Sequence, residues 1–327
     1  MAYIQVLGGL ALLVFAGEFL VRGSVSLAQR FGVPPLIIGL TIVAFGTSAP
    51  ELLVGIDSVL IGAPTLALGN VIGSNIANIW LVLGLPAIIA PLMCGSPKTI
   101  SNIVFMLLIS GLFIIFGYMG GFAMFEGVIF LILLAGFLYH SSKSRQAEGG
   151  CNDQDILVDE LGDVAKNPDG YFLATVLVIG GLVGLAYGAH LLVTGSVTIA
   201  RGLGVSEAVI GLTLVALGTS IPELVTAIIA SLKGHCDVAL GNVVGSNIFN
   251  ILAIIGVSSQ FGTIPMPDDI LSFDVWVMLA ASLTLLPFAL MKTKINRIAG
   301  IVFCTLYVSY MFIVAQGITS GSAVMVQ

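Results

Sequence analysis

The sequence predicts an all-α polytopic membrane protein with ten transmembrane helices, arranged as two inverted repeats of five helices each. Three observations support this fold class. Only 9% of the 327 residues are charged and 58% are hydrophobic, whereas a soluble domain carries roughly 25% charged residues. The apolar residues lie in long continuous runs. Two polar blocks inside these runs occur twice in the chain.

The composition excludes several classes of protein. A soluble enzyme is excluded by the hydrophobicity, and an outer-membrane barrel by the length of the apolar runs. A net charge of −6 without a basic stretch argues against a nucleic-acid partner. Four widely spaced cysteines imply neither a disulfide framework nor a zinc site. Three scattered histidines offer no catalytic constellation, so we expect no enzyme and no bound cofactor.

Each predicted helix rests on one apolar run, because a membrane span needs about 20 apolar residues. Residues 103–139 are too long for one span, and Gly117-Tyr-Met-Gly-Gly121 divides them as a hairpin. The first basic residue is Arg22, so the first run is a retained helix and not a cleaved signal. The ten spans lie near 3–28, 36–59, 66–92, 100–117, 122–140, 171–199, 208–231, 238–262, 271–291 and 296–317.

A hydrophilic segment separates two membrane halves. Residues 141–170 are rich in Asp and Glu, and we interpret them as a solvated acidic linker. The predicted domains are therefore a first repeat (1–140), the linker (141–170) and a second repeat (171–327).

The distribution of Lys and Arg predicts the orientation in a plasma (inner) membrane. If both termini are extracytoplasmic, ten basic residues face the cytoplasm and only Arg201 faces outside. The acidic linker is then cytoplasmic. The ten cytoplasmic residues are Arg22, Arg30, Lys98, Lys143, Arg145, Lys166, Lys233, Lys292, Lys294 and Arg297.

Two sequence blocks are duplicated at one constant offset. GLTIVAFGTSAPEL (39–52) recurs as GLTLVALGTSIPEL (211–224), and GNVIGSNIAN (69–78) recurs as GNVVGSNIFN (241–250). Five predicted spans separate each helix from its copy. Because five is odd, the second copy crosses the membrane upside down. Such inverted repeats are typical of secondary transporters, whose substrate site lies at the midplane between the repeats.

Glu51 and Glu223 are the central candidates for a binding site. A carboxylate inside a membrane is costly and usually marks an ion pathway. Pro50 and Pro222 precede the two glutamates and interrupt the helices, which exposes backbone carbonyl oxygens. Carboxylate, hydroxyl and carbonyl oxygens are the ligands that hard cations such as calcium prefer.

The second block places small polar residues on one helix face at i, i+4 and i+8. These residues are Asn70, Ser74 and Asn78 in the first copy and Asn242, Ser246 and Asn250 in the second. Glycines four residues apart in the same block allow close helix approach.

Together, the duplicated Gly-Thr-Ser-Xaa-Pro-Glu and Gly-Ser-Asn-Ile-Xaa-Asn motifs resemble the α-repeats of the calcium/cation antiporter superfamily, and most closely those of prokaryotic sodium/calcium exchangers. The resemblance implies a calcium site formed by Glu51, Glu223, Asn78 and the carbonyls of Thr47 and Thr219. It implies sodium sites formed by Ser48, Ser74, Ser220, Ser246, the two glutamates and the carbonyls of Ala44 and Ala216. Pro50, Pro222, Asn70, Asn242 and Asn250 would line the site. It also implies that the first and sixth helices slide across a rigid core.

We therefore expect an antiporter that exchanges sodium for calcium by alternating access. A proton-coupled divalent-cation exchanger on the same fold is the alternative, favoured only by Glu18 and His190 in the first and sixth helices. Asn250 stands where the potassium-dependent branch has an aspartate, so we expect potassium-independent transport. The expected partners are the two transported ions and the bilayer.

Overall fold

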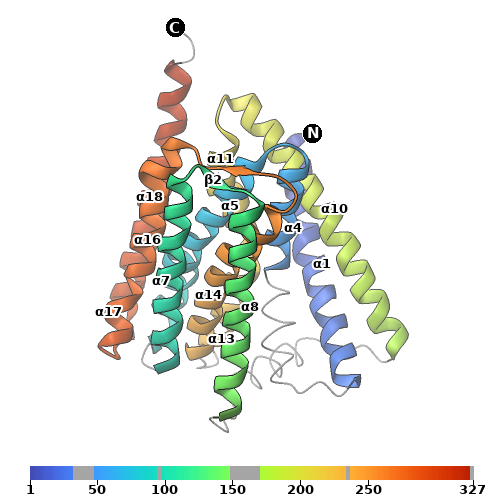
Figure 1. Cartoon of the computed structure of the whole chain (residues 1–327), viewed down its shortest axis with the longest axis vertical. Coiled ribbons are helices and arrows are strands. Elements are labelled where there is room, and N and C mark those ends of the chain that lie inside the picture. Colours follow the sequence, from blue (N-terminus) through green and yellow to red (C-terminus); the bar gives the residue numbers. More distant parts are fainter. Residues whose placement is uncertain (32–47, 94–96, 148–169, 233–235, 325–327) are drawn as a thin grey trace.

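The computed structural model describes residues 1–31, 48–93, 97–147, 170–232 and 236–324. These residues are almost entirely helical (Figure 1). The first half contains α1 (Ala2–Arg30), α4 (Ala49–Leu60), α5 (Pro64–Ala77), the π-helix η2 (Asn78–Val82), α6 (Gly84–Ile89), α7 (Pro97–Tyr118) and α8 (Met124–Ala147). The second half contains α10 (Tyr171–Leu203), α11 (Glu207–Ile210), η3 (Gly211–Val215), α12 (Ala216–Thr219), α13 (Ile221–Leu232), α14 (Cys236–Phe249), η4 (Asn250–Ile254), α15 (Ile255–Ser258), η5 (Ile270–Asp274), α16 (Val275–Leu283), α17 (Leu285–Leu290) and α18 (Arg297–Val324).

Eight helices in the described part of the chain are long and apolar enough to cross a membrane. A ninth candidate is the bent pair Glu207–Thr219 and Ile221–Leu232. The predicted span 36–59 lies partly outside the described residues, which contain its second part as α4. The predicted acidic linker lies outside them over 148–169, while α8 continues to Ala147.

The predicted hairpin between residues 117 and 121 is confirmed. Helix α7 ends at Tyr118 and α8 begins at Met124. Gly120 and Gly121 adopt φ angles of 114° and 121°, a backbone region that glycine enters readily because it has no Cβ.

Helices α1 and α10 form a closely packed antiparallel pair at one side of the molecule (Figure 1). A Cβ atom on Gly9 would lie 2.7 Å from the Leu192 backbone nitrogen, and one on Gly181 would lie 2.7 Å from the Leu20 nitrogen. Small residues permit this approach, which matters because lipid provides no hydrophobic force between helices.

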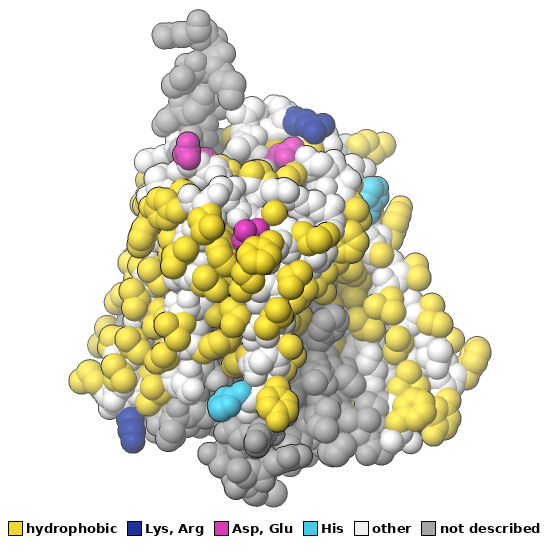
Figure 2. Space-filling view, viewed as in Figure 1, with side chains coloured by type: hydrophobic (Ala, Val, Ile, Leu, Met, Phe, Trp, Pro, Cys, Tyr) yellow, Lys and Arg dark blue, Asp and Glu magenta, His cyan; other side chains and the backbone are white. Residues whose placement is uncertain are grey.

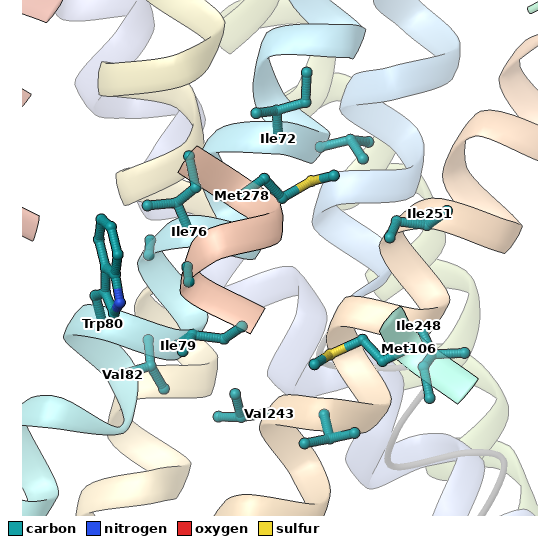
Figure 3. Packing of buried hydrophobic residues seen from close by; sticks show 14 of the residues in the cluster. Ile72, Ile76, Ile79, Trp80, Val82, Met106, Val243, Ile248, Ile251 and Met278 are labelled. Carbon is teal, nitrogen blue, oxygen red and sulfur yellow. The ribbon is translucent and has the colours of Figure 1, made fainter. Parts of the chain in front are cut away.

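The buried apolar side chains form two clusters. The larger cluster lies among α5, α7, α14, α16 and α18. Figure 3 shows part of it, with Met278 near Ile72 and Ile76, and Met106 near Ile248. The smaller cluster joins α1 and α10 to parts of α4, α5 and η3. The α1–α10 pair thus packs through an apolar cluster separate from that of the main helix bundle.

Two short antiparallel ladders connect the halves of the chain. Strand β1 (Leu92–Met93) pairs with β4 (Lys294–Ile295), and β2 (Gly121–Phe122) pairs with β3 (Ile264–Pro265). Each ladder therefore takes one strand from each half, and neither ladder was predicted from the sequence.

The exterior fits a lipid environment. Figure 2 shows hydrophobic side chains over the middle of the visible face, with most of the described charged side chains nearer its two ends and one acidic side chain among the hydrophobic ones. Helices α1, α10 and α18 expose large apolar residues such as Phe15, Val183 and Phe312. The protein is thus a multi-pass membrane protein.

Candidate functional site

Two helices that begin at equivalent proline-containing motifs, α4 and α13, supply the central residues of the site. Helix α12 ends at Thr219 and α13 begins at Ile221, with a bend of 42° between the two segments. Pro222 has no N–H and crowds the carbonyl four residues earlier, so a regular helix cannot continue through it. The repeat-equivalent α4 begins at Ala49, with Ser48 as its N-cap and Pro50 in its first turn. The break predicted from Pro222 is therefore confirmed.

Each of these two helices carries a glutamate in its first turn. Glu51 lies in α4 and Glu223 in α13, and each is 1% exposed. Their carboxylates are near enough to interact electrostatically. Two buried carboxylates at close range repel each other strongly unless positive charge is supplied. A bound cation at this position would remove that repulsion.

Hydroxyl groups connect the two halves of the chain around the glutamates. Ser48 Oγ lies 3.4 Å from Glu223 Oε1, to which it donates, and 3.3 Å from Ser246 Oγ. Thr219 Oγ1 donates to Asn70 Oδ1 over 3.2 Å, and Ser74 Oγ approaches the same oxygen at 3.5 Å. All six of these residues are at most 5% exposed. The predicted polar face of α5 therefore meets residues of the second half in the interior of the protein.

Asparagines of the continuous segments α5–η2 and α14–η4 form a second set of contacts between the halves. Asn78 Nδ2 donates to Asn247 Oδ1 over 3.0 Å. Asn250 Nδ2 donates to Asn75 Oδ1 over 3.3 Å. Asn75 and Asn247 were not among the predicted residues. Both are the asparagine of the duplicated Gly-Ser-Asn motif, and this repetition could have marked them as functional. They lie off the i, i+4, i+8 helix face on which the prediction was based.

A π-helical turn begins at each of the two equivalent asparagines. Segment η2 starts at Asn78 and η4 starts at Asn250. The Leu83 N–H reaches back five residues to the Asn78 carbonyl over 3.2 Å. Such wide turns are rare and are found frequently at functional sites. η2 packs against α13 and η4 against α4, so each of these asparagines begins a segment that contacts a glutamate-bearing helix.

Several buried oxygen atoms in this region accept no hydrogen bond from the described residues. They are Glu51 Oε2, Asn78 Oδ1, Ser220 Oγ and Asn250 Oδ1. Burying such atoms without partners is costly. They are also hard oxygen donors of the kind that calcium and sodium require.

The remaining predicted residues differ in their placement. Ala216 is fully buried, and its carbonyl accepts the Ser220 N–H over 3.1 Å. Asn242 is only half-buried, unlike its equivalent Asn70. Thr47 and Ala44 lie outside the described residues.

Glu18 and His190, predicted as candidates in the first and sixth helices, each have an acidic or basic partner. Glu18 forms an ion pair with Arg22 one turn away in α1. His190 Nδ1 lies 3.4 Å from Asp57 Oδ1, which joins α10 to α4. Asp57 was not among the predicted residues.

The chain matches known proteins over nearly its whole length. A family model described as "Sodium/calcium exchanger protein" matches residues 1–143 and 173–316. The putative antiporter CaxA of Alkalimonas amylolytica is 38% identical over 95% of this chain and 98% of its own. The sodium/calcium exchanger MaX1 of Methanosarcina acetivorans is 31% identical over 95% of this chain and 97% of its own.

A solved structure supports the same relationship. The sodium–calcium exchanger NCX_Mj, soaked with Na⁺ and Ca²⁺, is 37% identical, with a TM-score of 0.62 over 94% of this chain and 96% of its own. The family consists of transporters and not enzymes, as the sequence predicted. On this evidence, and on the duplicated motifs, the chain belongs to the sodium/calcium exchanger protein family.

Proposed function

We propose that the protein is an antiporter that exchanges sodium for calcium across the plasma membrane by alternating access, without a requirement for potassium. The observation that carries this proposal is the pair of buried glutamates, Glu51 and Glu223. They come from equivalent positions in the two halves, and Ser48 of the first half donates to Glu223 of the second. The two carboxylates carry a charge of up to −2, which matches one calcium ion.

We propose that Glu51, Glu223, Asn78 and the backbone carbonyls of Thr47 and Thr219 bind calcium. The unpartnered oxygens of Glu51 and Asn78 support this assignment. Sodium would bind to the same carboxylates with Ser48, Ser74, Ser220, Ser246 and the carbonyls of Ala44 and Ala216. Shared carboxylates make the two cargoes compete, because the site cannot neutralise both sets of charge at once. Competition of this kind produces exchange.

The proposed architecture is ten spans in two inverted repeats, with both termini extracytoplasmic. Each of the ladders β1–β4 and β2–β3 pairs a strand of the first half with a strand of the second half, which supports a pseudo-two-fold relation between the halves. Helix α1 begins and α18 ends at the same end of the molecule (Figure 1), as an even number of spans requires. Antiparallel packing of α1 on α10 fits the same arrangement.

Alternating access would come from movement of the α1–α10 pair. This pair has its own apolar cluster and contacts the interrupted helices α4 and α12. The Leu10 side chain lies against Gly218, at the break itself. Sliding of α1 would therefore change access to the glutamates without disturbing the larger cluster.

Flux into reconstituted vesicles tests the proposed function. Purified protein in liposomes is loaded with sodium, diluted into sodium-free medium, and calcium uptake is measured. An outward sodium gradient should drive uptake, and an outward proton gradient of the same size should not. Uptake driven by protons alone would favour the proton-coupled alternative, and the absence of calcium flux under every gradient would contradict both.

A further inference from the structure

Four asparagines, two from the α5–η2 segment and two from the α14–η4 segment, form a reciprocal arrangement. Asn78 and Asn250 occupy equivalent positions in the two repeats, as do Asn75 and Asn247. Asn78 donates across to Asn247, and Asn250 donates across to Asn75. The two donors are therefore equivalent positions in the two repeats, and so are the two acceptors. The same contact is built twice, once in each direction between the halves.

Both contacts engage the nitrogen end of the donor amide. In each case Nδ2 gives its proton to the partner's Oδ1, at 3.0 Å for Asn78 and 3.3 Å for Asn250. The opposite ends, Asn78 Oδ1 and Asn250 Oδ1, are buried and accept no hydrogen bond from the described residues. An amide can offer either a donor or an acceptor, depending on a half-turn of its last side-chain torsion. Holding the nitrogen therefore decides that the oxygen is the end left available.

The two acceptors are themselves held in place. Asn247 Nδ2 donates to the Asn75 backbone carbonyl over 3.2 Å, and Asn75 Nδ2 lies 3.6 Å from Met278 Sδ. Both acceptor side chains are 1% exposed. Because their nitrogen ends are occupied, their oxygens are directed toward Asn78 and Asn250. Met278 belongs to the larger apolar cluster (Figure 3), so this network is anchored in the main bundle rather than in the α1–α10 pair.

We propose that Asn75 and Asn247 are positioning residues that turn the amide oxygens of Asn250 and Asn78 toward the transported cation. This inference rests on the proposed function and adds two residues to it. Neither residue touches the ion. Each holds a side chain of the opposite half, and a free amide at either position would present its NH₂ group to the cation for part of the time. Outer contacts that orient a metal ligand commonly change affinity ten- to a hundredfold.

Pairwise coupling of variants tests the proposal. The dissociation constant for Ca²⁺ is measured by calorimetry on purified protein in sodium-free buffer. Asn247→Ala should weaken calcium binding by about tenfold or more. In that background Asn78→Ala should add little, because the oxygen it removes is no longer held toward the ion. Likewise, Asn75→Ala and Asn250→Ala should not be additive with each other.

The crossed pattern separates positioning from packing. Asn75→Ala keeps the backbone carbonyl to which Asn247 donates, so Asn247 should still hold Asn78 in place. The effects of Asn75→Ala and Asn78→Ala on calcium affinity should therefore be additive, although the two residues are one helical turn apart. A packing role would couple Asn75 with Asn78 within the helix, and additive effects for Asn78 with Asn247 would overturn the proposal. Ser110→Ala is the control: Ser110 is fully buried, hydrogen-bonds to Met106 O in its own helix, and should leave calcium affinity unchanged.

A second variant keeps the test decisive if Asn247→Ala does not fold. Asn247→Asp loses the Nδ2 contact with the Asn75 carbonyl, but a carboxylate has an acceptor oxygen at both ends and can still accept from Asn78 in either orientation. Asn78→Ala should therefore still weaken binding in this background by its full wild-type factor. A smaller factor would contradict the proposal. If wild-type protein binds no calcium, the proposed function fails; if it binds calcium without the crossed coupling, only the positioning role fails.

Discussion

Glu51 and Glu223 are buried acids that lie near enough to interact, and two carboxylates ionised together at this range would repel each other. At the residue scale, this repulsion is the source of the proposed cation affinity. Replacing either by Gln keeps the shape but removes one charge, which leaves a divalent ion under-compensated in a medium of low dielectric. Removing one partner of a buried charge pair costs about 3–5 kcal/mol.

We therefore predict that Glu51→Gln and Glu223→Gln each lower calcium exchange by more than about a hundredfold. The fold should be retained, because neither change adds volume. The measurement is calcium flux in proteoliposomes, with gel filtration of each variant as the control for folding. Wild-type rates in either folded variant would exclude the assigned site.

Asn250 leads to a second prediction at this scale. A potassium ion bound beside calcium would add positive charge that a third carboxylate could offset. An amide adds no net charge, and Asn250 donates its nitrogen to Asn75. We expect sodium-driven calcium flux to continue when potassium is replaced by choline on both sides of the membrane. A flux that collapses without potassium and recovers on its addition would refute the charge argument.

At the scale of elements, the contact between α1 and α10 depends on glycine. A Cβ atom on Gly9 would lie 2.7–2.8 Å from backbone atoms of Leu192 and Gly188. Backbone atoms cannot rotate away, so the two helices would have to separate. The neighbouring Gly8 is exposed, and a Cβ there would meet no atom of the described structure within 4 Å.

We predict that Gly9→Ala destabilises the protein by about 1–3 kcal/mol and slows exchange, whereas Gly8→Ala changes stability by no more than about 0.5 kcal/mol. Thermal unfolding in detergent measures the first effect and vesicle flux the second. Because both changes raise helix propensity equally, the difference between them reports the helix contact. Equal behaviour of the two variants would mean that the close contact does not govern movement or stability.

At the scale of the whole molecule, the even number of proposed spans requires both termini on one side. In a variant lacking the native cysteines, Met325→Cys should react with a membrane-impermeant thiol reagent added outside intact cells. Asp155→Cys, in the proposed cytoplasmic linker, should react only after the membrane is opened. The opposite pattern would reverse the topology, and reaction of both positions from outside would contradict the ten-span count.

The sequence alone predicted the family, most helix boundaries and the two glutamates. Composition and apolar run length are local properties, and in lipid every backbone group must be satisfied within its own helix. Spans such as 171–199 and 100–117 could therefore be located without knowledge of their neighbours, and the structure has them as α10 and α7. The break at Pro222 was equally local, since proline acts on the carbonyl four residues before it.

Only the tertiary structure decided which polar groups meet across the halves. The contacts of Ser48 with Glu223, and of Asn247 with Asn78, join residues about 170 positions apart in the chain. The internal repeat shows which residue of the second half is equivalent to each residue of the first. It does not show which residues touch, because sequence similarity between two segments carries no information about contacts between them. Asn75 and Asn247 lie off the face that helical periodicity picked out, and their role depends on which end of an amide is engaged. Such a choice is set by the crossing of α5 and α14 in space, which no local pattern of residues contains.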